Sequence, residues 1–191
     1  LLLVAKRQPA ASDLRLVMSI SKGVVDLERI GDEAVKIARM ASKIAAEGKS
    51  AYGYAEVQHL SNQVRLMLNN SLEAFSQSNA EQAFEVMRND SVVNTEYQSA
   101  IRALMTYIME DSRHVSKVIN IMWILRSLER IGDHAQNVAE LVINYISGQD
   151  VRHSDYTMVE KAVQEANDRL AARQVSTLSA NELETSDSDE G

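Results

Sequence analysis

The hexapeptide LERIGD occupies residues 27–32 and recurs, letter for letter, at residues 128–133. The two copies begin 101 residues apart. The same shift pairs further apolar residues: Leu14 with Val115, Met18 with Ile119, and Ile20 with Ile121. Because the shift aligns apolar positions as well as the hexapeptide, the two segments are predicted to be copies of one long helix.

The composition indicates an all-α protein. The 191 residues include one proline and seven glycines, and good helix formers are abundant. The chain has no cysteine, which excludes disulfides and thiolate-bound zinc. No apolar run approaches the ~20 residues that span a bilayer, so we expect no direct membrane insertion. Nothing indicates the basic face that a nucleic-acid partner would require.

Periodicity and capping residues predict the end of one helix at residues 1–7, stopped by Gln8-Pro9, then four long helices and a weaker last one. Ser12, Asn79 and Ser112 are suitable N-caps, and Gly48 and Gly148 are suitable stops. The expected helices cover residues 12–47, 52–77, 80–110, 112–147 and, more weakly, 156–172.

The repeat predicts two three-helix bundles related by pseudo-symmetry. Residues 1–50 would be the C-terminal part of the first bundle, residues 51–150 the second, and residues 151–191 a C-terminal helix with an acidic, disordered tail. The last eleven residues carry five carboxylates and no basic side chain, and the formal charge without them is −2 rather than −7. Since residue 1 aligns with residue 102, the first bundle is expected to lack ~50 or more residues at its N-terminus.

Each copy of the hexapeptide carries two carboxylates one helical turn apart, Glu28 with Asp32 and Glu129 with Asp133. The second pair is expected to flank an inward-facing apolar stripe on its helix. Glu28 is expected within such a stripe, and Asp32 beside it. The stripe predicted for the first helix consists of Val17, Ser21, Val24, Glu28, Gly31, Val35 and Ala38.

The helix at 80–110 carries a matching polar pair, Asp90 and Asn94, on its otherwise apolar face. If that helix packs antiparallel to the last long helix, the two pairs can meet. Buried carboxylates without partners are costly, and a divalent or trivalent cation would neutralise them. Gly31 and Gly132 would allow close helix approach beside such a site.

Two alternatives to a metal site remain open. The carboxylates could form surface ion pairs, Glu28 with Arg29 and Glu129 with Arg126, which contribute little stability. They could also be neutralised by Arg29 and Arg130 in a purely structural bundle. The exact repeat and the facing polar pair favour the metal.

Other polar and apolar residues have simpler interpretations. The single Glu56-x-x-His59 half-motif is expected to be an ordinary exposed pair, since carboxylate di-iron chemistry needs it twice. His134 is expected at the surface, and Trp123 in the core or an interface. Methionines at helical spacing are expected to fill the core: Met18, Met67, Met105, Met109 and Met122.

The chain resembles the PhoU family of bacterial phosphate-transport accessory and regulatory proteins. The resemblance covers about residues 1–153 and rests on both LERIGD copies and on longer matching segments. These segments are AKRQPAASDLRLV at 5–17, MTYIMEDSR at 105–113 and LERIGDHAQNVAELV at 128–142.

The resemblance implies two three-helix bundles, similar in arrangement to spectrin repeats, in a cytoplasmic homodimer that reaches the inner membrane through its partners. It implies a negative regulator of the phosphate-starvation response that couples the ATPase subunit of the phosphate ABC transporter to a sensor histidine kinase. It implies no enzymatic activity. The alternative that we keep is a metal-dependent enzyme of the carboxylate-bundle type.

The resemblance also implies metal binding through Glu/Asp-x-x-x-Asp motifs, with iron, zinc, manganese or magnesium as candidate ions. Carried over to this chain, the ligands are Glu28, Asp32, Asp90, Asn94, Glu129 and Asp133. Two departures from an ideal pattern stand out. Asn94 takes a place where a carboxylate is common, and Asn137 in the second copy corresponds to Lys36 in the first.

Overall fold

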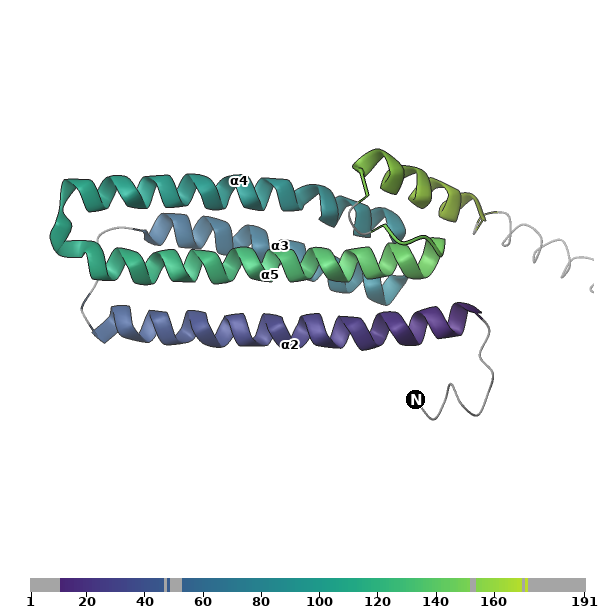
Figure 1. Ribbon diagram of the computed structural model, residues 1–191, viewed down its shortest axis with the longest axis horizontal. Coiled ribbons are helices and arrows are strands. Elements are labelled where there is room, and N and C mark those ends of the chain that lie inside the picture. The colour runs from purple at the N-terminus through teal and green to yellow at the C-terminus, as the bar shows by residue number, and fades with distance from the viewer. Residues whose placement is uncertain (1–10, 47, 49–52, 152–153, 170, 172–191) are drawn as a thin grey trace, which may run out of the picture.

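The computed structural model describes residues 11–46, 48, 53–151, 154–169 and 171, and the regular structure within them is entirely helical (Figure 1). The helices predicted from residue 12 onwards are confirmed, with boundaries that agree to within about three residues where both ends are described. The helix end predicted at residues 1–7 and the acidic tail lie outside the described residues. The helices are α2 (Ala11–Ala46), α3 (Tyr54–Gln77), α4 (Ala80–Glu110), the short 3-10 helix η1 (Ser112–His114), α5 (Val115–Ser147) and a last helix at residues 156–169.

The helix α5 is the centre of the molecule and packs against α2, α3 and α4. The helices α3 and α4 also pack against each other, so α3, α4 and α5 form a three-helix bundle. In Figure 1, α2 and α4 run antiparallel to α5, while α3 runs parallel to it. None of the described helices is long and apolar enough to cross a membrane.

Local capping explains where α4 and the 3-10 helix η1 before α5 begin. The Asn79 side chain accepts a hydrogen bond from the Gln82 backbone N–H at 3.0 Å, as predicted for the start of α4. The prediction that Ser112 caps the next helix is wrong. Ser112 begins η1, and Asp111 caps η1 because its carboxylate accepts from the Arg113 backbone N–H at 3.0 Å and from the Arg113 guanidinium. The N-cap position of α5 is His114, whose side chain makes no capping hydrogen bond.

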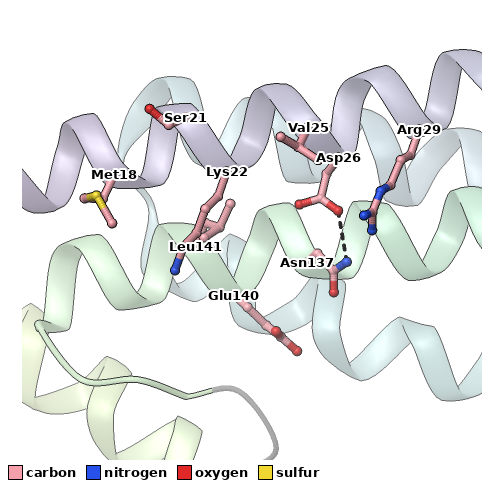
Figure 2. Close-up of a pocket in the computed structure, with 9 residues that line it drawn as sticks. All are labelled: Met18, Ser21, Lys22, Val25, Asp26, Arg29, Asn137, Glu140 and Leu141. Carbon is pink, nitrogen blue, oxygen red and sulfur yellow. Dashed lines mark hydrogen bonds between the residues drawn. The ribbon is translucent and has the colours of Figure 1, made fainter. Parts of the chain in front are cut away.

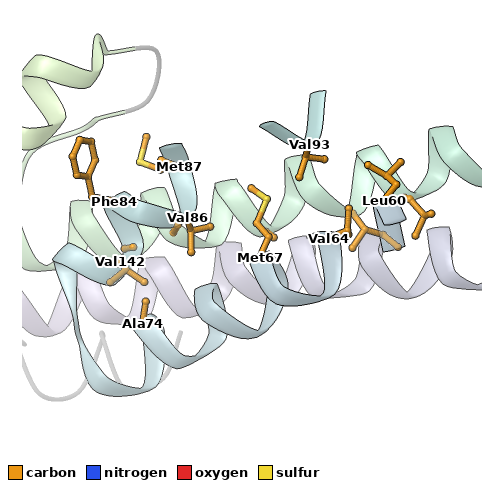
Figure 3. Close-up of a cluster of buried hydrophobic side chains, with 14 of the residues drawn as sticks. Leu60, Val64, Met67, Ala74, Phe84, Val86, Met87, Val93 and Val142 are labelled. Carbon is orange, nitrogen blue, oxygen red and sulfur yellow. The ribbon is translucent and has the colours of Figure 1, made fainter. Parts of the chain in front are cut away.

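The core lies between α3, α4 and α5, where apolar side chains from all three helices interdigitate (Figure 3). Leu60 of α3 and Leu104 of α4 are fully buried in it. The stripe predicted for α5 is confirmed, because every member is buried: Val118, Ile121, Leu125, Leu128, Gly132, Ala135, Ala139 and Val142.

The stripe predicted for α2 is exposed, contrary to expectation. Val24 and Val35 are 58% and 49% exposed. The reason is that α2 packs on α5 through its opposite side, which carries Asp26, Ile30 and Glu33. The described residues contain no helix over the predicted stripe.

Several single-residue expectations also fail. Met18, Met105 and Met109 lie at the surface, whereas Met67 fills the core and Met122 packs against it. Trp123 is 60% exposed, which excludes the core and leaves the other expected place, an interface. Periodicity does not separate a residue at the edge of an apolar stripe from one at its centre.

The two hexapeptide glycines differ. A Cβ on Gly132 would lie 3.3 Å from Val93 Cγ1, which confirms close packing against α4. A Cβ on Gly31 would meet no atom within 4 Å, so the expected close approach at Gly31 is not found in the described structure.

Candidate functional site

The predicted ligand pairs of the second repeat lie on adjoining faces of α4 and α5. We call Asp90, Asn94, Glu129 and Asp133 the α4–α5 acidic cluster. The Asn94 amide donates to Asp90 Oδ2 at 2.8 Å. Asp90 Oδ1 and Glu129 Oε2 are buried and have no hydrogen-bond partner among the described residues. The prediction that the two helices bring these pairs together is therefore supported, because the carboxylates also influence one another's ionisation.

Burial and mutual repulsion disfavour the charged forms of two carboxylates in the cluster. Burial, followed by the charges of Asp133 and Glu140, raises the pKa of Asp90 to about 6. Burial raises the pKa of Glu129 above its usual range, and Asp133 and Asp90 add to the shift against the opposing charge of Arg126. Binding of protons or of a cation would therefore stabilise the cluster, because either one neutralises its negative charge.

The donor set fits a hard cation in chemistry but does not form a closed coordination shell. Two orphaned carboxylate oxygens and an amide oxygen are ligands that such ions prefer. Arg126 Nη1 lies 2.6 Å from Glu129 Oε1 and neutralises part of the charge. Among the described residues, no three His, Asp or Glu side chains converge closely enough to hold a metal ion. Side chains of the cluster would have to reorient to bind one.

The first repeat presents its pair differently. Glu28 and Asp32 are both exposed on α2, on or beside the uncovered stripe. Neither lies in a group of three or more potential metal ligands among the described residues. Of the arginines predicted as counter-charges, Arg130 contacts Glu33 rather than a hexapeptide carboxylate, with Nε 3.2 Å from Oε1.

A buried polar cluster, which sequence reasoning missed, joins α2 to α5. His134 Nδ1 lies 2.9 Å from Asp26 Oδ1, and Asn137 donates its amide N–H to the same oxygen at 3.0 Å. His134 is only 6% exposed, so the expectation of a surface role is wrong. The histidine is buried because α2 covers this face of α5, and no sequence signal indicated that Asp26 would face it.

A second buried cluster lies further along the same interface, around Glu33. Its carboxylate accepts from Lys36 Nζ at 2.8 Å and contacts Arg130. Burial alone would raise the pKa of Glu33, but hydrogen bonds from Lys36 and Ser127 and the charges of Lys36 and Arg130 outweigh it and hold that pKa below its usual range.

The two clusters are related by the sequence repeat. A shift of 101 residues takes Asp26 to Ser127, Glu33 to His134, and Lys36 to Asn137. The contact of Asp26 with His134 thus corresponds to the contact of Ser127 with Glu33. The two copies of the long helix therefore pack antiparallel about a local pseudo-two-fold axis.

A pocket of about 410 Å³ opens between α2 and α5 beside the Asp26 cluster (Figure 2). Lys22 and Arg29 border it on α2, and Asn137 and Glu140 border it on α5. No pattern in the sequence predicted this pocket. Its rim carries positive and negative side chains, and Met18, Val25 and Leu141 form its apolar walls.

Fold and site together define an all-α helical-bundle protein built on a repeated long helix with paired carboxylates. The PhoU domain model matches residues 1–41 and 57–142, and the chain belongs to the PhoU family. This family is not an enzyme family, so the alternative of a carboxylate-bundle enzyme is set aside.

Relatives in this family cover most of the chain. The chain is 54% identical over 162 residues to a phosphate-specific transport system accessory protein PhoU homolog of Pseudomonas aeruginosa, a match that covers 85% of the chain and 67% of the relative. It is 44% identical over 151 residues to the phosphate-specific transport system accessory protein PhoU of Escherichia coli. That match covers 79% of this chain and 62% of the relative. The chain thus spans about two thirds of the length of the curated relatives that it matches.

Crystal structures of two family members share the fold. The structure of PhoU from Pseudomonas aeruginosa matches with a TM-score of 0.75 and 56% identity over 77% of this chain and 70% of that one. The phosphate transport system regulatory protein PhoU from Streptococcus pneumoniae matches with a TM-score of 0.68 and 26% identity. This match covers 75% of this chain and 67% of that one.

Proposed function

We propose that this protein is a negative regulator of the phosphate-starvation response that acts as an adaptor. It would couple the ATPase subunit of the phosphate ABC transporter to a sensor histidine kinase, so that the kinase stays silent when phosphate is ample. The observation that carries the proposal is family membership over residues 1–41 and 57–142, with a phosphate-specific transport system accessory protein homolog 54% identical over 162 residues. A body of long helices with extensive surfaces also suits protein–protein contact.

The experiment is genetic. Cells that lack the protein should express secreted alkaline phosphatase in phosphate-rich medium, and the full coding sequence supplied in trans should restore repression. Continued low expression in the deletion strain would contradict the proposed function.

We place the protein in the cytoplasm, peripheral to the inner membrane through its partners, and as a homodimer. Light scattering of the purified protein tests the dimer, and fractionation of cells with and without the transporter tests the partner-dependent location.

For the architecture, we propose that α2 belongs to a first three-helix bundle that pairs with the bundle of α3, α4 and α5. The support is the pseudo-two-fold relation across α2 and α5, together with the exposed apolar stripe of α2. Four residues of the α2 stripe correspond under the 101-residue shift to buried residues of the α5 stripe: Val17, Val24, Gly31 and Ala38 to Val118, Leu125, Gly132 and Ala139. Two further helices over Val24 and Val35 would complete the symmetry.

We also propose that the α4–α5 acidic cluster holds a divalent or trivalent cation. The two orphaned buried oxygens of Asp90 and Glu129 support this proposal. Bound there, an ion would neutralise the cluster and tie α4 to α5. Glu28 and Asp32 would contribute to a second site only with a helix packed over them.

Elemental analysis of chelator-free protein tests the metal proposal. Metal should accompany the wild-type chain and fall clearly in Glu129→Ala/Asp133→Ala, while Glu85→Ala, an exposed change on α4, should leave it unchanged. If Glu129→Ala/Asp133→Ala and Glu85→Ala contained equal amounts of metal, the proposed metal site would be wrong.

A further inference from the structure

Four basic side chains recur every seven residues along α2: Lys22, Arg29, Lys36 and Lys43. All four are exposed. Because a seven-residue step advances two helical turns with a drift of about 20°, these side chains keep to one side of α2 over about 32 Å. We call them the basic row.

The basic row borders the seam between α2 and α5. Lys22 and Arg29 line the pocket there, opposite Asn137 and Glu140 (Figure 2). Lys36 reaches Glu33, which is buried against α5. The row therefore follows the same edge of the seam from the pocket towards the C-terminal end of α2.

The face of α5 beside the row points outward between α2 and α4. Trp123, Arg126 and Arg130 follow one another at three- and four-residue steps and so share a face of α5. Arg130 reaches Glu33 on α2, and the Arg126 guanidinium lies 6.0 Å from the centre of the Tyr97 ring on α4. Trp123 is 60% exposed on this face.

Apolar surface lies at both ends of the row. Met18 and Val25 are 52% and 46% exposed at the pocket end, and Ile119 joins Trp123 at the other end. Exposed apolar side chains of this size beside regularly spaced charges are typical of a surface that binds a helix. The docking face comprises the basic row, the pocket, Ile119 and Trp123.

Asp26 and Glu33, the two acidic side chains buried beside the row, are already engaged. The exposed Asp32 and the pocket residue Glu140 also border the row, and their two negative charges reduce but do not balance its four positive ones. Asp26 accepts from Asn137 and meets His134, and Glu33 holds Lys36 and Arg130. Within the described residues, Lys22, Arg29 and Lys43 take part in no ion pair. These three cations remain available to an acidic partner.

We propose that the docking face binds an amphipathic α-helix of a partner protein whose acidic residues recur every seven residues. Those residues would meet the basic row, and apolar residues of the same helix would cover Trp123 and enter the pocket beside Met18. The proposal deepens the adaptor function and rests on it, because it states the chemistry of one partner.

A synthetic peptide of ~21 residues, long enough for the row, tests the proposal. The peptide carries Glu every seven residues beside an apolar stripe, and a control peptide carries Lys in place of each Glu. Trp123 is the single tryptophan of the chain, so its emission reports binding at the docking face without a label.

The variant Lys22→Glu/Arg29→Glu/Lys43→Glu reverses the three available cations. The matched control, Arg65→Glu/Arg102→Glu/Lys161→Glu, makes the same charge change at exposed residues outside the docking face. We expect the wild type and the control to bind the Glu peptide alike, and the reversal variant to bind it at least about tenfold more weakly. The Lys peptide should bind the wild type at least about tenfold more weakly than the Glu peptide does. Added salt should weaken binding of the Glu peptide to the wild type.

Three results would overturn the proposal. One is no change in Trp123 emission up to about 1 mM Glu peptide. Another is equal affinity for the reversal and control variants. The third is binding to phosphatidylglycerol vesicles, lost in the reversal variant, without binding to the peptide, which would identify a membrane surface. Failure of peptide binding beside normal repression of alkaline phosphatase overturns the docking face alone. Low alkaline phosphatase in the deletion strain overturns the regulatory function whatever the peptide does.

Discussion

Asp26 of α2 and His134 of α5, 108 residues apart in the chain, meet across the helix interface with 2.9 Å between Oδ1 and Nδ1. Both are buried, and Asn137 donates to the same carboxylate oxygen. A buried polar contact of this kind is satisfied only when the helices are in one register. The pair therefore fixes how α2 lies on α5.

Replacing His134 by Ala should lower the free energy of unfolding by about 1–3 kcal/mol, because Asp26 would lose a buried partner. Chemical denaturation at neutral pH measures the loss. His59, whose side chain is mostly exposed and contacts Glu96, is the matched control, and His59→Ala should cost less than about 1 kcal/mol. Equal losses in both variants would contradict a structural role for the buried pair.

Glu33 should stabilise the fold in a pH-dependent way. Its pKa is lowered in the folded state, so its stabilising effect is complete above the unfolded-state pKa and is lost as pH falls through the folded-state pKa. Glu33→Gln should cost about 1–2 kcal/mol at pH 7 and less below pH ~4. Chemical denaturation of the wild type and Glu33→Gln across this pH range gives the difference in their free energies of unfolding. That difference should narrow at low pH. A constant or growing difference would contradict the ion-pair account.

The two hexapeptide glycines should respond oppositely to alanine in the 191-residue chain. Gly31→Ala fills open space in an exposed helix and should stabilise by about 0.5–1 kcal/mol. Gly132→Ala places Cβ 3.3 Å from Val93 and should give no gain or a loss of about 1–2 kcal/mol. Thermal denaturation of the two variants compares them directly. A similar gain at both positions would show that α4 does not press on α5 at Gly132.

Metal-free Asp90→Asn should be more stable than the wild type above pH 6. The folded-state pKa of Asp90 is raised to about 6, so the wild type loses stability as pH rises towards and through that value. The gain should be about 1 kcal/mol at pH 7.5, since water screens a half-buried carboxylate, and should vanish near pH 4. Glu85→Gln, an exposed change in the interior of α4, should show no such gain.

The sequence predicted the helices and the buried face of α5 because both depend on local periodicity. The repeat of LERIGD also indicated correctly that two long helices are equivalent. Asp90, Asn94, Glu129 and Asp133 were expected on facing helices, and the antiparallel packing of α4 and α5 places them there.

The sequence could not predict which face of α2 would be buried. That helix carries an apolar stripe and also a polar face with Asp26 and Glu33, and periodicity selects the apolar one. In the structure α5 supplies His134, Asn137 and Arg130 as partners, so the polar face is the buried one. Partners so distant in sequence leave no local signal.

The central claim is that the protein keeps a sensor kinase silent in ample phosphate. The most direct measurement is alkaline phosphatase activity in phosphate-rich medium for a strain that lacks this protein and for one that lacks both the protein and the kinase. The account predicts high activity in the first strain and low activity in the second. Low activity in the first strain, or high activity in both, would contradict it.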